Sequence, residues 1–482
     1  MEKKDLKANY TNNKLKKIIM GCIGLLALIL VVAYVGIAQY YKKHFFANTY
    51  INGMDCSNLT ASEAKELITT NVNTYVLGIT ARDGSKEKIG AKDIDLTCTF
   101  ERELTDVLAE QSVYTWLVNA FKENKVDHPY QLHYDEKKLD ARIKNLGFLD
   151  KEKQIEPSNA TISKYSEETG FTIVKEDQGN KIIKKKLKKA IVDAVNSLES
   201  NLVLEKTDCY KTPTVYSDDP ILKKTLDTIG KYMQTKLTYR FGDKTEVFDG
   251  SKIGPAIKVD DEYNVIIDNA VVKEFVDYIG KTYNTIFTNR KFKTSYGTEI
   301  VVEGGDYGWW LNRNEELKQV IECIKNGEQK EKEPVYYQKA VQYGEDDLGN
   351  TYVEINLGAQ HLFVYKDGKR VLESDFVSGN VSKGYATPTG VYPIQYKETD
   401  TYLKGQNGDG TSYRSHVDYW MPFNGGIGMH DATWRKGVFG GTIYKNNGSH
   451  GCINLPPEKA KAIFGIISKG TPVIVYDTSK KK

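Results

Sequence analysis

The feature that most constrains this chain is a long uncharged run near its N-terminus. Residues 18–38 carry no charged side chain over 21 positions and are mostly apolar. As an α-helix rising about 1.5 Å per residue, the run spans roughly 32 Å, enough for the ~30 Å hydrocarbon core of a bilayer. We therefore predict a transmembrane helix over residues 18–38.

Charged residues beside the run predict its orientation. Six lysines lie in residues 1–17, whereas only Lys42 and Lys43 follow the run closely. The positive-inside rule makes residues 1–17 a cytoplasmic tail and places the bulk of the chain outside a membrane that it crosses once. The alternative is a cleaved signal peptide, because residues 36–38 (GIA) fit a cleavage site. We favour a retained anchor, since the run is longer than the usual signal core of about 7–15 residues.

The chain is too long to fold around a single hydrophobic core. A chain of 482 residues fits about three folded units plus tails. Its 67 basic and 64 acidic residues leave a net charge of +3. No basic stripe interleaved with aromatic residues is present, which argues against a nucleic-acid partner.

Two α+β modules are predicted after the apolar run. Residues 49–64 read TYINGMDCSNLTASEA, which predicts a strand, a tight turn, and a helix opened by a capping box of Thr60 and Glu63. Residues 169–197 and 298–326 share one order: a strand, a glycine turn, a short apolar segment and an amphipathic helix. We interpret them as the ends of two copies of one module, residues 50–210 and 216–333. The last residues, 328–333 (EQKEKE), are expected to form a charged linker.

Both modules resemble the peptidoglycan-binding domains of cell-wall enzymes, and residues 49–64 resemble the segment that opens such domains. A spacer without ligand affinity is the alternative. Trp309 and Trp310 are suited to stacking on sugar rings, but we expect them to pack in the core.

Four cysteines in this region admit three disulfide pairings, which the sequence does not distinguish. Their wide and irregular spacing is unlike a disulfide framework. We therefore expect free, buried thiols at Cys56, Cys98, Cys209 and Cys323.

The segment from residue 430 to 455 carries the candidate chemistry. It reads HDATWRKGVFGGTIYKNNGSHGCINL, with one thiol and two imidazoles. A thiol with a pKa of ~8.5 is mostly protonated at neutral pH, so a nucleophilic Cys452 needs a nearby base or a positive local potential. Taken alone, the pattern also fits a buried structural cysteine. It matches no standard zinc site.

Short strands precede this segment. Residues 352–357 alternate and predict a strand, and residues 360–365 and 371–377 predict a hairpin. With TPTGVYPI at 387–394 and SHGCINL at 449–455, the order resembles the YkuD-type L,D-transpeptidase catalytic domain over residues 350–476. The resemblance implies a mainly β, β-sandwich-like catalytic domain, preceded here by two α+β modules and the transmembrane helix.

The resemblance also implies roles for the site residues. Cys452 is the expected nucleophile and His430 the general base, with the Asp431 carbonyl orienting the imidazole. The N–H groups of His450, Gly451 and Cys452 are expected to form an oxyanion hole, with Ser449 in support. Substrate contacts are expected from Tyr419, Trp420, Arg435 and Asn454. No metal or organic cofactor is needed. His416, which has no role in this set, is expected in a loop.

The implied reaction joins two peptidoglycan stem peptides. Cys452 attacks a donor tetrapeptide, releases its terminal D-alanine, and the side-chain amine of an acceptor diamino acid resolves the thioester as a 3→3 cross-link. The same site using water would be an L,D-carboxypeptidase, and a non-catalytic wall-binding protein is the alternative from another class. The resemblance further implies acylation by carbapenems, and a catalytic domain that works outside the membrane, in the cell wall.

Overall fold

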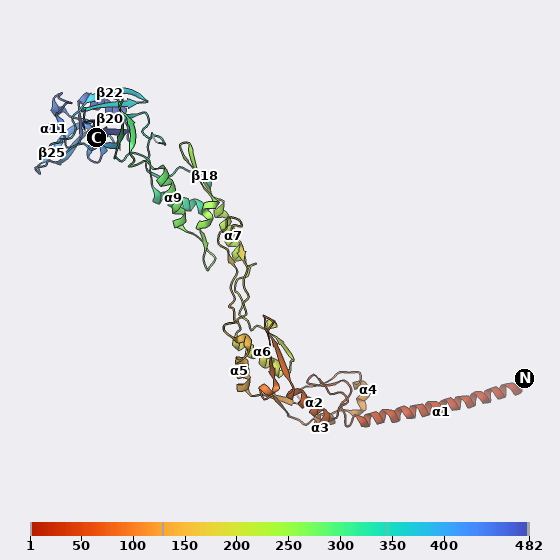
Figure 1. Cartoon of the computed structure of the whole chain (residues 1–482). Helices are drawn as coiled ribbons and strands as arrows, with labels where there is room; N and C mark the ends of the chain where they lie inside the picture. Colours follow the sequence, from red (N-terminus) through yellow and green to blue (C-terminus); the bar gives the residue numbers. More distant parts are fainter. Residues whose placement is uncertain (1, 128–129, 345, 480–482) are drawn as a thin grey trace. The chain divides into compact units, whose positions relative to one another are not determined.

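The computed structural model describes residues 2–127, 130–344 and 346–479, with side chains from residue 11 onward. The chain divides into two compact units (Figure 1). Unit 1 comprises Met1–Ala160 and Lys175–Ser217, and unit 2 comprises Thr161–Val174 and Asp218–Lys482.

Unit 1 begins with one long helix, α1 (Glu2–Tyr40). Its stretch Thr11–Tyr40 is long and apolar enough to cross a membrane, a property that membrane anchors share with signal sequences. The side chains of residues 11–33 are all exposed, whereas Ala38 and Tyr41 are covered by the rest of unit 1.

The body of unit 1 is an α+β module. The predicted capping box is confirmed: Glu63 N donates to Thr60 Oγ1 at 3.2 Å and Thr60 N to Glu63 Oε2 at 2.8 Å, at the start of α2. Helix α6 buries the face Leu187, Ile191, Ala194 and Val195, an amphipathic spacing. The elements of unit 1 after α1 are β1 (Thr49–Ile51), β2 (Met54–Asp55), α2 (Ala61–Asn73), β3 (Val76–Thr80), β4 (Lys86–Gly90), η1 (Ala91–Asp93), β5 (Thr97–Phe100), α3 (Leu104–Ala109), η2 (Val113–Thr115), α4 (Trp116–Asn119), β6 (Asn124–Val126), β7 (Tyr130–His133), α5 (Glu136–Lys144), η3 (Gly147–Leu149), α6 (Lys184–Asn196), β10 (Asn201–Val203) and η4 (Leu204–Lys206).

Unit 2 opens with a second α+β module of related topology. In unit 1 the hairpin β3–β4 is extended by the parallel strand β10, and in unit 2 the hairpin β11–β12 is extended by the parallel strand β18. Its elements are β8 (Thr161–Ile162), β9 (Ile173–Val174), α7 (Pro220–Met233), β11 (Lys236–Phe241), β12 (Lys244–Phe248), α8 (Gly250–Ile253), η5 (Gly254–Ala256), β13 (Ile257–Val259), β14 (Val265–Ile267), α9 (Asn269–Tyr283), β15 (Arg290–Lys293), β16 (Glu299–Val302), β17 (Trp310–Leu311), α10 (Arg313–Asn326), β18 (Gln329–Glu331) and β19 (Tyr336–Gln338).

The prediction of a linker at residues 328–333 is wrong. Residues Gln329–Glu331 form β18, paired with β11. Lys332 is buried, and its Nζ forms an ion pair with Oε2 of the buried Glu316 at 2.8 Å. Residue 332 is therefore part of the folded core and not of a solvated linker. The strand near Ile173 belongs to unit 2, whereas the helix that begins at Lys184 belongs to unit 1. The two therefore do not form the end of one module, as the sequence had predicted. Of the tryptophan pair, Trp309 is buried and stacks on Tyr343, as predicted, whereas Trp310 is 41% exposed.

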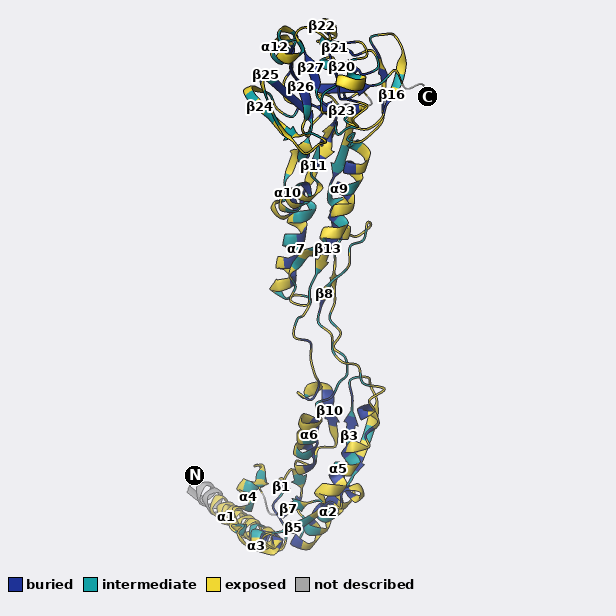
Figure 2. Ribbon diagram, turned by 90° about the vertical axis from the view of Figure 1, so that its left-hand side faces the viewer, coloured by how far each residue is buried: buried dark blue, intermediate teal, exposed yellow. Residues whose placement is uncertain are grey.

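The domain at residues 350–476 of unit 2, which the sequence predicts to be catalytic, consists of two packed sheets. One has the strand order β22-β21-β20-β28-β23 and the other β24-β25-β26-β27. Apolar side chains from both sheets form the buried core between them, and Figure 2 colours β23, β26 and β27 mostly as buried. The elements are β20 (Tyr352–Asn356), β21 (His361–Lys366), β22 (Lys369–Asp375), β23 (Gly390–Pro393), β24 (Glu398–Gln406), β25 (Ser412–Asn424), β26 (Ile427–Asp431), η6 (Thr433–Arg435), α11 (Tyr444–Asn447), β27 (Ile453–Leu455), α12 (Pro457–Ile466) and β28 (Pro472–Tyr476). The predicted class, a mainly β catalytic domain after α+β modules, is confirmed.

The catalytic domain shares a core with the module before it. Phe292 and Tyr307 of the module pack with Val391 and Ile474 of the catalytic sheet. Tyr307 N donates to Val391 O at 3.0 Å. These contacts make the second module and the catalytic domain one compact body.

Candidate active site

The site is built on two parallel neighbouring strands. His430 on β26 lies opposite Asn454 on β27, and Cys452 immediately precedes β27. Both strands are in the four-stranded sheet, with apolar neighbours such as Met429 and Ile453 facing the core. The alternation of strand side chains therefore fixes His430 and Asn454 on the same face of the sheet.

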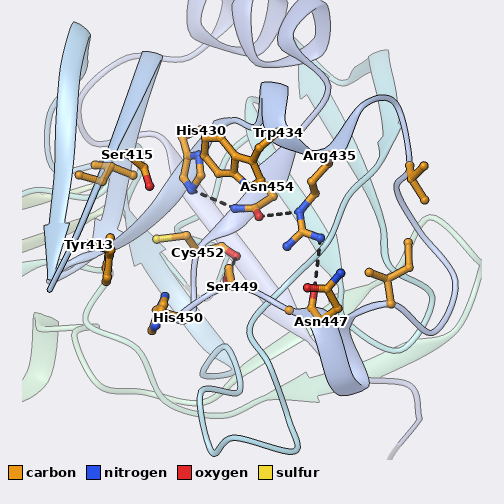
Figure 3. A pocket seen from close by; sticks show the side chains of 14 residues that line it. Tyr413, Ser415, His430, Trp434, Arg435, Asn447, Ser449, His450, Cys452 and Asn454 are labelled. Atoms are coloured by element: carbon orange, nitrogen blue, oxygen red, sulfur yellow. Dashed lines mark hydrogen bonds between the residues drawn. The ribbon is translucent and has the colours of Figure 1, made fainter. Parts of the chain in front are cut away.

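A chain of hydrogen bonds sets the tautomer of His430 (Figure 3). Arg435 Nε donates to Asn454 Oδ1 at 2.7 Å, so the amide nitrogen of Asn454 faces His430 Nε2, at 3.0 Å. His430 Nδ1 lies 2.8 Å from the carbonyl oxygen of Asp431. A carbonyl can only accept, so Nδ1 carries the proton and Nε2 offers a lone pair.

The turn before Cys452 is held by Ser449. Its Oγ accepts from Gly451 N at 3.0 Å and donates to Cys452 O at 2.6 Å. Gly451 has a φ of 116°, which L side chains rarely adopt. The Gly451 N–H was expected in the oxyanion hole, but in the structure it donates to Ser449 Oγ instead.

Close backbone packing supports this turn from behind. A Cβ added at Gly379 would lie 1.8 Å from Tyr385 O and 2.9 Å from Gly451 Cα. Thr387 Oγ1 links the two segments, accepting from Gly379 N at 3.1 Å and donating to Gly451 O at 2.7 Å. Thr387 is the first residue of the TPTG sequence, and through these two hydrogen bonds that sequence supports the turn before Cys452.

The residues around Cys452 line a pocket of about 650 Å³. Its floor carries Cys452, His430 and Asn454, and the segment 434–448 contributes Trp434 and Arg435 (Figure 3). The ring of His450 stacks on Tyr413 with 4.7 Å between centroids. The other lining residues are Leu403, Ser415, Val438, Ile443, Asn447, Gly448 and Ser449.

Burial keeps the thiol and the imidazole neutral at rest. Desolvation raises the pKa of the Cys452 thiol to about 11, against a smaller lowering by a hydrogen bond from the Gly428 backbone. Desolvation also lowers the pKa of His430 below its ordinary 6.5, outweighing the hydrogen bond to the Asp431 carbonyl and the nearby Asp431 carboxylate, which raise it. A half-buried, desolvated thiol and a buried imidazole both favour their uncharged forms.

Several predicted residues lie elsewhere. Tyr419 packs against Phe464 of α12, and Trp420 is 5% exposed, so neither lines the pocket. The same strand, β25, instead reaches the pocket through Tyr413 and Ser415. His416 is on β25 rather than in a loop, 2.7 Å from Asp400. Asp431 is buried, and its carboxylate accepts from Tyr419 N at 2.8 Å.

Sequence reasoning missed Tyr413, Ser415 and Trp434 as pocket residues. Period-two alternation gives no signal for Tyr413 and Ser415, because it groups them with Tyr419, which packs against Phe464, and not with Trp420, the partner of His430 in register. Within the described ranges, no group of three or more His, Cys, Asp or Glu side chains is placed to hold a metal ion.

Comparison with known proteins identifies the family. Residues 350–475 match the L,D-transpeptidase catalytic domain, and residues 87–203 and 220–333 each match a family described as a peptidoglycan binding domain. The chain therefore belongs to the L,D-transpeptidases, with peptidoglycan-binding-type domains before its catalytic domain.

Three individual proteins are similar to parts of this chain. An L,D-transpeptidase of Enterococcus faecium, solved as a crystal structure, is 36% identical over 52% of this chain and 100% of its own, with a TM-score of 0.42. A catalytic domain from E. faecium, solved acylated by ertapenem, is 50% identical over 27% of this chain and 98% of its own, with a TM-score of 0.25. L,D-transpeptidase 2 of Mycobacterium tuberculosis is 29% identical over 155 residues, 28% of this chain. The chain spans 35% of the length of this curated relative.

Proposed function

We propose that this chain is a cysteine-dependent peptidoglycan L,D-transpeptidase that forms 3→3 cross-links between stem peptides. The observation that carries the proposal is the convergence of Cys452, His430 and the Asn454–Arg435 pair in one pocket of an L,D-transpeptidase catalytic domain.

In the acylation step, Cys452 is the nucleophile and His430 the general base. The Sγ–C bond forms at the carbonyl of the third stem residue while the thiol proton passes to His430 Nε2. The tetrahedral intermediate expels D-alanine, whose amine takes that proton as the C–N bond breaks. Backbone N–H groups of His450 and Cys452 stabilise the developing oxyanion.

The polarity of the hydrogen bonds gives Asn454 a defined part in this step. Neutral Nε2 accepts from the Asn454 amide, but protonated Nε2 is itself a donor. Proton uptake therefore breaks the contact with Asn454 and frees Nε2–H to face the leaving amine. Asn454 and Arg435 are positioning residues for the resting imidazole, beside any contact they make with substrate.

In the second step, the side-chain amine of an acceptor stem attacks the thioester carbonyl. Its proton passes to His430 Nε2 and returns to the sulfur as the Sγ–C bond breaks, which restores the neutral pair. Water in place of the amine would give L,D-carboxypeptidase activity. The relative solved with an ertapenem adduct supports carbapenem acylation of Cys452 as well.

The proposed location of the protein rests on α1 and on the two modules that follow it. We infer that α1 is a retained single-pass anchor with residues 1–17 in the cytoplasm, supported by its apolar length and by the lysines before it. The modules at 50–210 and 216–333 then hold the catalytic domain, 350–476, within the wall, where they contact peptidoglycan.

The test is mass spectrometry on the full chain in detergent micelles, incubated with a disaccharide-tetrapeptide. A dimer lighter than two substrate molecules by one D-alanine is expected. It should vanish with Cys452→Ala and persist with Cys98→Ala, the matched control at a partly buried thiol outside the catalytic domain. Tripeptide alone would assign a carboxypeptidase, and substrate retained without product would leave a wall-binding protein.

A further inference from the structure

Unit 1 presents one apolar surface that the proposed reaction does not use. Tyr114, Leu117, Val118 and Phe121 are 57%, 47%, 56% and 84% exposed. They lie in η2, α4 and the turn that follows. Their spacing of i, i+3, i+4 and i+7 aligns them on one side of a helical segment, here called the 114–121 face.

The segment that carries this face is bound to the end of α1. Trp116 Nε1 donates to the backbone oxygen of Tyr34 at 3.2 Å, and the Tyr34 hydroxyl donates to the backbone oxygen of Tyr114. The Trp116 ring lies 5.4 Å from the ring of Tyr34 and 6.2 Å from that of Tyr41. Figures 1 and 2 both draw α4 beside the end of α1.

Polar contacts on either side of the segment hold it in this position. Gln111 Nε2 donates to the His44 carbonyl at 2.9 Å, and Gln111 Oε1 accepts from Phe46 N at 3.0 Å. Near the end of the segment, Asn48 Nδ2 donates to Ala120 O at 2.8 Å. The segment is therefore fixed against the chain that leaves α1.

This attachment sets the depth of the 114–121 face. Tyr34 lies four residues before the end of the uncharged run at Ala38, about 6 Å along the helix. Amphipathic segments that lie in a membrane interface bury their apolar side about 5–10 Å into the boundary between headgroups and acyl chains. If α1 spans the bilayer, the 114–121 face is at that depth.

We propose that residues 113–121 insert into the lipid leaflet next to unit 1 and form a second, interfacial attachment beside α1. The partner is the headgroup–acyl boundary of the bilayer, which suits two aliphatic side chains flanked by Tyr114 and Phe121. The inference rests on the proposed retention of α1 in the membrane. Its consequence is that unit 1 is held in one orientation to the bilayer, which a single helix would not enforce.

Nitroxide accessibility in lipid nanodiscs tests the proposal. The full chain, with Cys22, Cys98 and Cys452 replaced by alanine, is labelled at Phe121→Cys in nanodiscs of phosphatidylcholine and phosphatidylglycerol. Collisions with oxygen, which concentrates in lipid, are compared with collisions with a water-soluble nickel chelate. The matched control is Ile155→Cys, 57% exposed in unit 1 and beside Gly179, and Leu28→Cys in α1 reports on the anchor.

The expected result is an oxygen-to-nickel collision ratio at 121 that is severalfold higher than at 155 and lower than at 28, which lies at the middle of the uncharged run. A ratio at 121 equal to that at 155, with position 28 in lipid, would overturn the insertion and leave the anchor standing. A water-like ratio at position 28 would overturn the anchor and the insertion together.

Discussion

At the scale of single residues, Asn454 gives the sharpest test of how His430 is tuned. Asn454→Asp keeps the shape of the side chain but places a carboxylate against Nε2, where it accepts from the imidazolium and stabilises it. The pKa of His430 should rise by about 1–3 pH units. Because the base must be unprotonated, the acid limb of the acylation rate should move to higher pH by the same amount.

Stopped-flow acylation by a carbapenem across pH measures this shift. Asn447→Asp is the control, since it adds the same charge to the pocket while Arg435 keeps its contact with the Asn447 backbone oxygen. An unmoved acid limb in Asn454→Asp would show that Asn454 does not act on His430.

The resting thiol gives a second prediction at this scale. Desolvation raises the pKa of Cys452 to about 11, so its thiolate fraction should keep increasing up to that pH. Alkylation by iodoacetamide, followed at the Cys452 peptide by mass spectrometry, should therefore have its midpoint near pH 11. A midpoint at or below ~8.5, the value of an ordinary thiol, would show a thiolate already stabilised at rest.

At the scale of elements, the close contact behind the catalytic turn should tolerate no side chain. In Gly379→Ala the new methyl group meets Tyr385 O and Gly451 Cα, so the turn before Cys452 must shift. We expect a loss of about 1–3 kcal/mol in the free energy of unfolding, together with slower acylation. Gly465→Ala in α12, where a Cβ meets no atom within 4 Å, is the control. Equal melting temperatures and rates for both variants would contradict this account.

How far the sequence predicts these elements depends on the range of the interactions. The capping box of α2 is local, so residues 60–63 sufficed to predict it. The rare residues Cys452 and His430 identified the site, but the pairing of Arg435 with Asn454 depends on the register of β26 against β27. Tyr419 and Trp420 were predicted from the resemblance alone, which does not show that β25 reaches the pocket through Tyr413 and Ser415. Residues 328–333 look like a linker because a short edge strand with charged side chains has no sequence signature of its own.

At the scale of the whole molecule, two observations tie the second module to the catalytic domain. Arg290 of the module binds Asp347, in the segment that leads into the catalytic domain; the two side chains are 5% and 1% exposed and form paired bonds, Nε–Oδ1 and Nη2–Oδ2, each of 2.8 Å. A buried pair of this kind costs about 3–5 kcal/mol when one partner is lost. Gly305 packs so tightly on Val391 that an added Cβ would lie 2.0 Å from its carbonyl oxygen. Neither part of unit 2 can unfold without exposing the other.

The molecule should therefore unfold in two calorimetric transitions, one for each unit, although its sequence suggests three folded domains. Ile279→Ala in the second module and Ile355→Ala in the catalytic domain, both fully buried, should each cost about 2–5 kcal/mol and lower the same transition. Leu187→Ala in unit 1 should lower only the other transition. Scanning calorimetry of the full chain in detergent measures all three. If Ile279→Ala and Ile355→Ala moved different transitions, the second module and the catalytic domain would be independent, and the shared core of Phe292, Tyr307 and Val391 would contribute little to the stability of either.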